Sequence, residues 1–141
     1  MSKLCEKIDE KTFMRHYITG LYKDKMDMLK TIPGLNDGIE VIFRDKYYFE
    51  STEENDYYLG EWDHVVRHGR GYYDFGNGEY YIGQFKNNEF DGKGCYYWPD
   101  GKKLEITYKN GKKHGIGFQS DKKGKSKCEY RDDVFIRWIF S

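Results

Sequence analysis

Hydrophobic and polar side chains alternate in the middle of the chain, as they do in β-strands that bury one face. In the segment 81–85 a period of two places Tyr81, Gly83 and Phe85 on the same side of the backbone. The stretches 39–43 and 47–49 are rich in β-branched and aromatic residues and predict two further strands. The chain is therefore expected to be mainly β.

The flanks follow other patterns. Apolar residues recur at helical spacing within residues 3–30, and Pro33-Gly34 would end such a helix. We favour a helix that packs across the first hairpins and covers their apolar edge. The alternative is a helix that binds a partner, or one that lies in a groove of the sheet and is autoinhibitory. The strongly apolar segment 134–140 is predicted to be a closing strand or a short helix that must be buried or bound. The residues that carry the helical pattern are Met14, Tyr17, Ile18, Leu21, Met28 and Leu29.

Glycines repeat every 23 residues between positions 58 and 126, without insertion or deletion. Aromatic residues keep the same period in two further columns, the second of which is broken at Asp121. Such regularity is the signature of a tandem repeat that stacks like units side by side. The first glycine column holds Gly69, Gly92 and Gly115, the second Gly71, Gly94 and Gly117, and the third Gly78, Gly101 and Gly124. The first aromatic column holds Trp62, Phe85 and Tyr108, and the second Phe75 and Trp98.

Each glycine column has a physical role. Gly60 and Gly83 lack a Cβ, which leaves room for flanking rings to lie over the backbone. Each Gly-x-Gly pair is expected to open the second strand at a bend that needs positive φ. The pairs Asn77-Gly78 and Asp100-Gly101 predict two-residue type I′ turns, and Lys123-Gly124 keeps the glycine in the third copy. One unit therefore comprises a strand, a loop, Gly-x-Gly, a second strand and a tight turn.

These residues resemble the MORN repeat, in which Tyr-x-Gly-x-Trp/Phe is followed by His-Gly-x-Gly and by an aromatic residue before a turn glycine. The first two copies carry Tyr58-Leu59-Gly60-Glu61-Trp62 and Tyr81-Ile82-Gly83-Gln84-Phe85. The third departs at Leu104 and Ile106, although His114-Gly115-Ile116-Gly117 is intact. The resemblance implies an elongated single-layer array of stacked antiparallel β-hairpins with an aromatic-lined groove, used mostly as a scaffold.

The fading of the period at both ends defines four regions. Residues 1–34 form an N-terminal helical segment, and residues 35–57 a degenerate capping hairpin around Arg44–Lys46. Residues 58–126 hold the MORN-like repeats. Residues 127–141 hold a degenerate repeat and an apolar C-terminal cap.

Charge, cysteine content and the length of the apolar runs argue against several classes of protein. Lys plus Arg and Asp plus Glu each number 24, and a chain without a basic excess is a poor general nucleic-acid binder. Its three cysteines are widely spaced, which favours a reducing compartment over a disulfide framework. The sequence lacks an apolar run of membrane-spanning length and a signal-peptide pattern, so we expect a soluble cytoplasmic protein.

The candidate catalytic residues are explained by the repeat. His68 and His114 occupy equivalent positions, which Asp91 fills in the intervening copy, and each is expected to bond locally beside its Gly-x-Gly bend. His64 and His68 are four residues apart, a spacing that suits a metal on a helix and not on a strand. Cys95 and Cys128 are expected to be buried structural thiols. We therefore expect no catalytic site, metal or cofactor.

The preferred function is that of a non-enzymatic adaptor for a protein partner, a helical or extended segment, in what the resemblance implies is a cytoskeletal, ciliary or cortical assembly. The alternative is a peripheral membrane module, because residues 102–127 hold nine lysines against two acids whereas residues 45–63 hold seven acids against one lysine. A subunit of a larger assembly is a third possibility. The groove is predicted from Tyr58, Trp62, Phe75, Tyr81, Phe85, Trp98 and Tyr108, and lipid contact from Lys102, Lys103, Lys109, Lys112 and Lys113.

Overall fold

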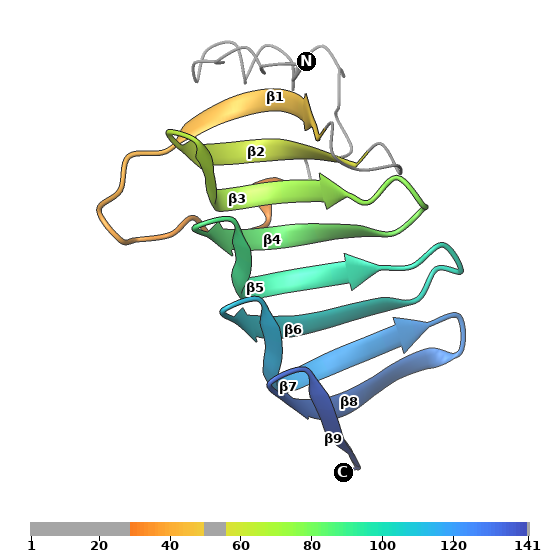
Figure 1. Cartoon of the computed structure of the whole chain (residues 1–141). Helices are drawn as coiled ribbons and strands as arrows, with labels where there is room; N and C mark the ends of the chain where they lie inside the picture. The colour runs from red at the N-terminus through yellow and green to blue at the C-terminus, as the bar shows by residue number, and fades with distance from the viewer. Residues whose placement is uncertain (1–28, 50–55, 141) are drawn as a thin grey trace.

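A computed structural model describes residues 29–49 and 56–140, without the side chain of Asp45. These residues form one antiparallel sheet in which every strand pairs with its neighbours in chain order (Figure 1). The expected array of stacked hairpins is confirmed. The helix expected within residues 3–30 lies outside the described residues apart from its last two positions. The strands are β1 Ile42–Tyr48, β2 Tyr57–Asp63, β3 Val66–Asp74, β4 Tyr80–Lys86, β5 Glu89–Tyr97, β6 Lys103–Lys109, β7 Lys112–Asp121, β8 Gly124–Arg131 and β9 Val134–Ile139.

Most of the tight turns lie at the opposite ends of the strands from those predicted; the exception is the β7–β8 turn, where only Lys122 and Lys123 separate the strands. Asn77-Gly78 and Asp100-Gly101 belong to wider loops, 75–79 and 98–102. In each pair only the glycine has positive φ, and Gly76 in the first loop has it too. The side chains of Asn77 and Asp100 accept backbone N–H groups two residues ahead, and this bonding stabilises the open loop in place of a type I′ turn. The prediction of two-residue turns at these pairs was wrong.

The real two-residue turns join the two strands within each repeat. Most of their residues have positive φ although they are not glycine. Asn and Asp tolerate this left-handed backbone conformation because their short side chains form local hydrogen bonds. These turns recur with the 23-residue period until the last, which is one residue early. The turns are His64-Val65, Asn87-Asn88, Asn110-Gly111 and Asp132-Asp133, and positive φ is found at His64, Asn87, Asn88, Asn110, Gly111, Asp132 and Asp133.

The first glycine of each Gly-x-Gly pair bends the second strand of its hairpin. Gly92 has a φ of 91°, a conformation that glycine adopts without strain, so the predicted bend with positive φ is confirmed. Directly after this bend the Lys93 N–H donates to Oε1 of Gln84 at 2.8 Å. A Cβ added to Gly92 would overlap that same oxygen, so glycine is needed here for space as well as for conformation. The equivalent glycines, Gly69 and Gly115, have φ values of 106° and 90°.

The region 35–57 contributes a single strand where a hairpin around 44–46 was predicted. Residues on both sides of the expected turn pair with β2: Phe43 with Glu61, and Tyr47 with Tyr58. The charged residues between them are accommodated by a register shift after Arg44. Because both halves of β1 reach the same neighbouring strand, the chain does not reverse here, and that prediction was wrong.

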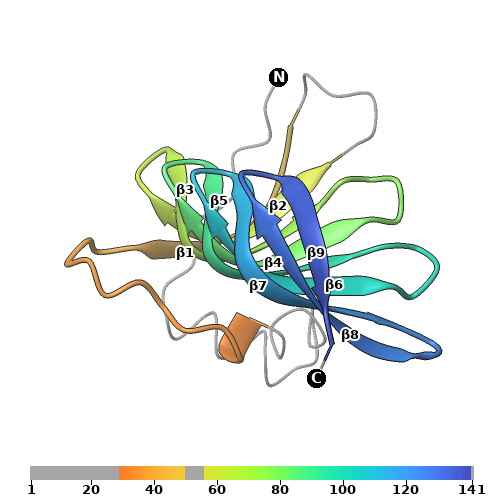
Figure 2. The same ribbon diagram turned by 90° about the horizontal axis from the view of Figure 1, so that it is seen from below.

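The sheet carries a hydrophobic cluster on each face. We call the first the aromatic face; its buried members are Tyr58, Trp62, Tyr81, Phe85, Leu104, Ile106, Tyr108 and Cys128. The second is covered by residues 29–41, which we call the strap and which runs along one side of the sheet before entering β1 (Figure 2). This strap face buries Leu29, Tyr57, Leu59, Tyr72, Ile82 and Cys95.

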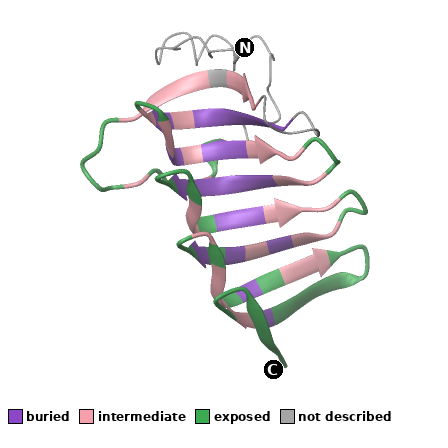
Figure 3. Ribbon diagram, viewed as in Figure 1, coloured by how far each residue is buried: buried purple, intermediate pink, exposed green. Residues whose placement is uncertain are grey.

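Burial decreases along the array. Five of the seven residues of β2 and of β4 are buried, whereas β8 buries only Cys128 and β9 buries none (Figure 3). The described part of the chain thus has a well-covered first half and an exposed C-terminal end.

Candidate functional site

A tyrosine lying over a pair of facing glycines forms the centre of each of the first two repeats. Gly83 pairs with Gly94 across β4 and β5, and a Cβ added to Gly94 would come within 3.0 Å of Tyr81 ring atoms. The Tyr81 hydroxyl donates to the Gln84 carbonyl at 2.8 Å. Burial raises the pKa of Tyr81, so its hydroxyl stays protonated and remains a donor. The predicted need for glycine beneath a ring is confirmed.

The same arrangement in the first repeat uses Tyr58 over Gly60 and Gly71, with its hydroxyl donating to the Glu61 carbonyl at 2.7 Å. In the third repeat Leu104 cannot make this hydrogen bond. There the side chain of Ile106 lies against Gly117. The substitutions that weaken the sequence pattern therefore also remove a hydrogen bond from the interior.

The predicted groove residues are mostly interior. Tyr58, Trp62, Tyr81, Phe85 and Tyr108 are each at most 5% exposed and contact one another in edge-on pairs such as Tyr58–Phe85 and Tyr81–Tyr108. These five support the sheet and present no surface to a partner. The remaining two, Phe75 and Trp98, are partly exposed and pack on Tyr96 with ring centroids 5.5 and 4.8 Å away.

Three contacts hold the strap on the sheet. Leu29, 3% exposed, packs in the strap-face cluster. The Pro33 carbonyl accepts the side-chain N–H of Gln84 at 2.8 Å. The carboxylate of Asp37 accepts Nε2–H of His68 at 2.6 Å. No sequence motif pairs these residues with one another, since the last two contacts join positions 51 and 31 residues apart.

His68 has a larger role than the repeat predicts. Its Nδ1 accepts the N–H of Asn87 at 3.4 Å, and Asp91 bonds likewise to Asn110. Each bond joins the bend to the turn of the following hairpin, 19 residues away, so the prediction of a local bond beside the bend was wrong for these two residues. The ring is fully buried, and Nδ1 as acceptor leaves the proton on Nε2 for Asp37. His114, the third equivalent, has no hydrogen bond to Nδ1.

The described residues contain no arrangement suited to catalysis. No group of three potential metal ligands occurs among them. His64 is exposed and pairs only with Asp63. Cys95 and Cys128 are buried as predicted, and burial raises the pKa of both thiols, which disfavours the nucleophilic thiolate.

The predicted lipid-binding lysines do not form one patch. Lys102 lies over the Trp98 ring at 4.7 Å, and Lys103 pairs with Glu105 at 3.2 Å. Lys109 and Lys112 lie at the other end of β6 and β7. Because a strand rises about 3.4 Å per residue, they are roughly 20 Å from Lys103. Lys113 lies over the Tyr130 ring.

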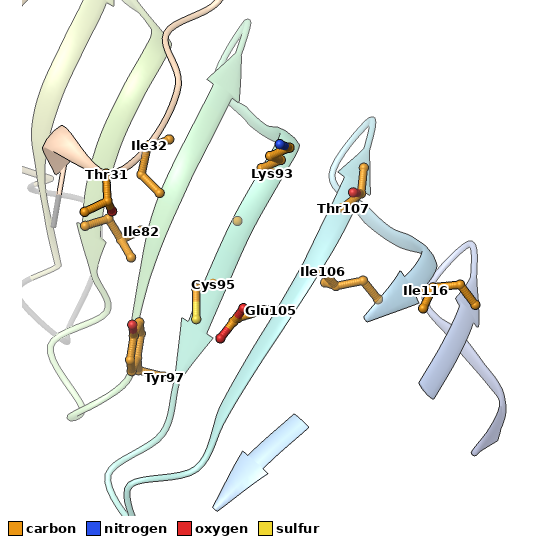
Figure 4. Close-up of a pocket in the computed structure, with 11 residues that line it drawn as sticks. Thr31, Ile32, Ile82, Lys93, Cys95, Tyr97, Glu105, Ile106, Thr107 and Ile116 are labelled. Atoms are coloured by element: carbon orange, nitrogen blue, oxygen red, sulfur yellow. The ribbon is translucent and has the colours of Figure 1, made fainter. Parts of the chain in front are cut away.

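An open groove of about 610 Å³ lies on the strap face beyond the end of the strap (Figure 4). Ile32 borders it at one end and Ile116 at the other, with Ile82 and Cys95 between them. Apolar side chains thus dominate a hollow whose border also carries Lys93 and Glu105. Sequence reasoning missed this groove because it depends on where the strap stops.

The last strand exposes apolar side chains. Phe135, Ile136 and Trp138 are each 41–42% exposed, and Val134 is more exposed still. The segment is a strand, one of the two predicted forms, but among the described residues nothing covers it. It is also the edge of the sheet, because β9 pairs only with β8.

The MORN-repeat family model matches residues 58–80, 81–103 and 107–126, so the chain contains three MORN repeats within residues 58–126. MORN repeats are generally non-catalytic, and no enzyme family matches. No curated protein is significantly similar to the chain in sequence. Within the described residues, no helix has the length and apolar character needed to span a membrane.

Proposed function

We propose that this chain is a non-enzymatic scaffold that binds a protein partner through its C-terminal hairpins. The observation that carries the proposal is the exposure of β9, where Phe135 and Trp138 touch each other at 5.1 Å between ring centroids and remain open to solvent. Exposed aromatic residues on an edge strand favour association, since they bury much area with few rotatable bonds. This surface replaces the buried aromatic column as the expected contact.

An edge strand gives a partner two modes of contact at once. The outer backbone of β9 offers N–H and C=O groups, and its side chains offer apolar area. Both a helical and an extended partner segment are compatible with this surface. We propose a cytoplasmic setting in which the chain is one component of a cytoskeletal, ciliary or cortical assembly.

The test is affinity capture by the full chain from its native cell, read by quantitative mass spectrometry. The variant Phe135→Ser/Trp138→Ser should lose specific proteins by roughly tenfold, the size expected for truncated aromatic anchors. Val65→Ser, which changes an 81% exposed residue at the β2–β3 turn, is the matched control and should keep them. A capture profile unchanged by the double variant would contradict the proposal.

Membrane binding through the basic end is the alternative and is measured in parallel. Sedimentation with vesicles containing phosphatidylserine or phosphoinositides at low salt should show little binding, because the lysines are distributed over both ends of the strands. Strong sedimentation that is lost in a Lys109→Glu/Lys112→Glu variant would favour the alternative.

A further inference from the structure

One row of paired residues crosses the strap face from β2 to β9. Residues paired across antiparallel strands point to the same face, so the row records how that face changes along the array. It is buried as far as Cys95, and beyond that it alternates charged and apolar residues that are half-buried or exposed. The row is Leu59, Tyr72, Ile82, Cys95, Glu105, Phe118, Lys127 and Ile139.

The strap shows which kind of segment packs on the buried part of this face. Leu29 and Ile32 are three residues apart on a helical turn, in which the Leu29 carbonyl accepts the Ile32 N–H at 3.1 Å. Both side chains pack on the strap-face cluster. The groove begins where this turn ends, so its exposed apolar residues Ile116 and Phe118 continue the surface on which the turn lies.

Charge distinguishes the two parts of the face. Glu105, the one acid among the described lining residues, pairs with Lys103, and Glu129 on β8 pairs with Arg137. Two lysines form no ion pair among the described residues: Lys93 on the groove border and Lys127, which pairs with Phe118 in the row. The Nζ of Lys125 lies 4.7 Å from the centre of the Phe118 ring. The groove is thus an apolar hollow bordered by one lysine without an ion pair among the described residues, and two further lysines lie on β8 beyond its Ile116 end.

We propose that the groove holds a helical segment of a partner protein that carries apolar residues at i, i+3 spacing and acidic residues on its flanks. The apolar pair lies between Ile32 and Ile116 and extends the strap's own packing. The acidic flanks face Lys93, Lys125 and Lys127, where opposite charge favours encounter and orientation. This inference names the partner class of the proposed scaffold and therefore rests on the proposed function.

A synthetic peptide is the probe. It has about 14 residues, with Leu at i, i+3, i+4 and i+7 and Glu on its flanks, and its control peptide replaces every Glu with Lys. Titration into the full chain with labelled Ile methyl groups should shift Ile82, Ile106 and Ile116, which line the groove, and leave Ile42 and Ile136 unmoved. The control peptide should bind at least about tenfold more weakly, as expected from charge repulsion.

Two variants of equal net charge localise the site. Lys93→Glu/Lys125→Glu/Lys127→Glu should weaken the acidic peptide by about tenfold or more. Lys86→Glu/Lys112→Glu/Lys122→Glu, which changes exposed lysines outside the groove lining, should change its affinity by less than about twofold. Ile116→Asp should abolish the methyl shifts while leaving the circular dichroism spectrum unchanged, since Ile116 is 43% exposed.

Other outcomes would overturn the inference. The first two are equal binding of both peptides and methyl shifts confined to β9. Another is that phosphatidylserine vesicles alone produce the same methyl shifts. The last two are that the groove methyl resonances shift on dilution, which would reveal a second copy as the occupant, or that they shift when residues 1–28 are removed, which would reveal that segment as the occupant. If Phe135→Ser/Trp138→Ser abolishes protein capture while the peptide fails to bind, the inference fails and the proposed function stands. If neither surface supports binding, both fail.

Discussion

The first two repeats and the last two hairpins follow one plan with different interiors. In the first two, a tyrosine covers facing glycines and the strap covers the opposite face. In the last two hairpins Leu104 takes the tyrosine's place, and β8 and β9 are mostly exposed. The difference shows that a single-layer sheet obtains a core only where rings cover its glycines and another segment covers its second face. Stability should therefore concentrate in the first half, while the exposed apolar side chains of β9 lie in the second.

The largest effect is expected from crowding the ring of Tyr81. Gly94→Ala places a Cβ within 3.0 Å of that fully buried ring, and it should lower the free energy of unfolding by about 3 kcal/mol. Gly117→Ala brings the added carbon to 2.7 Å from the Glu105 carbonyl oxygen and 2.9 Å from the Ile106 side chain, a smaller overlap than at Gly94, and it should cost less. Gly34→Ala meets nothing within 4 Å and is the neutral control. Urea denaturation of the three variants makes the comparison, and equal losses at Gly94 and Gly117 would contradict the contrast between the repeats.

The strap should matter more than an exposed residue on the same face. Leu29→Ala removes a side chain that is only 3% exposed and should destabilise the fold by about 2.5 kcal/mol. Phe118→Ala removes a larger side chain that is 37% exposed, and it should cost about 1 kcal/mol. Thermal unfolding followed by circular dichroism ranks the two. If Phe118→Ala proved the more damaging, the second half would hold more of the core than its exposure indicates.

A smaller difference in stability between the two halves of the sheet is expected when a tyrosine hydroxyl is removed from each. Tyr81→Phe leaves the Gln84 carbonyl without its donor and should cost about 1 kcal/mol. Tyr130→Phe removes a half-buried hydroxyl that forms no hydrogen bond among the described residues, and it should be neutral within about 0.5 kcal/mol. The measurement is again urea denaturation. A neutral Tyr81→Phe would show that water replaces the donor.

The parts of the fold that sequence predicts are those that recur within one period. The contact of Tyr58 with Gly71 or of Tyr81 with Gly94 lies inside a single hairpin, so the repeat itself encodes it. The turn positions were mispredicted because the recurring glycine marks the wider loops, whereas most of the true turns carry Asn, Asp or His in place of glycine. Asn110-Gly111 carried the type I′ signal at the correct end, whereas Asn77-Gly78 carried it in a loop that its own Asn side chain holds open.

The candidate site depends on contacts that no period encodes. Asp37 meets His68 across 31 residues, and the groove forms where Thr31 and Ile32 lie beside strands β4 to β7, far from them in sequence. The aromatic columns suggested a groove, but rings spaced to contact one another are buried by that same spacing, as Tyr58, Tyr81 and Phe85 show. Sequence therefore located the core of the sheet and missed its binding surface.

The smallest effect is a local release of the strap in acid. The hydrogen bond from His68, followed by that from the Ile39 N–H, lowers the pKa of Asp37 from 3.8. A carboxylate with a lowered folded-state pKa stabilises the strap above about pH 4, and this contribution is lost as the pH falls through the folded-state value. The Ile32 methyl resonance should move toward its unfolded position between about pH 4 and pH 2.

Asp37→Asn separates this carboxylate from the others that titrate in the same range. The amide can still accept the Nε2–H of His68 but carries no charge, so the variant should have a weaker strap at neutral pH and a flatter acid titration of Ile32. The resonance of Ile136, on the exposed last strand, should follow the same course in both proteins because no strap contact reaches β9 among the described residues. Identical acid titrations of Ile32 in the two proteins would assign the release to another group. A flatter titration confined to Ile32 would establish that the charge of Asp37, through its hydrogen bond with His68, helps to hold the strap on the first half of the sheet.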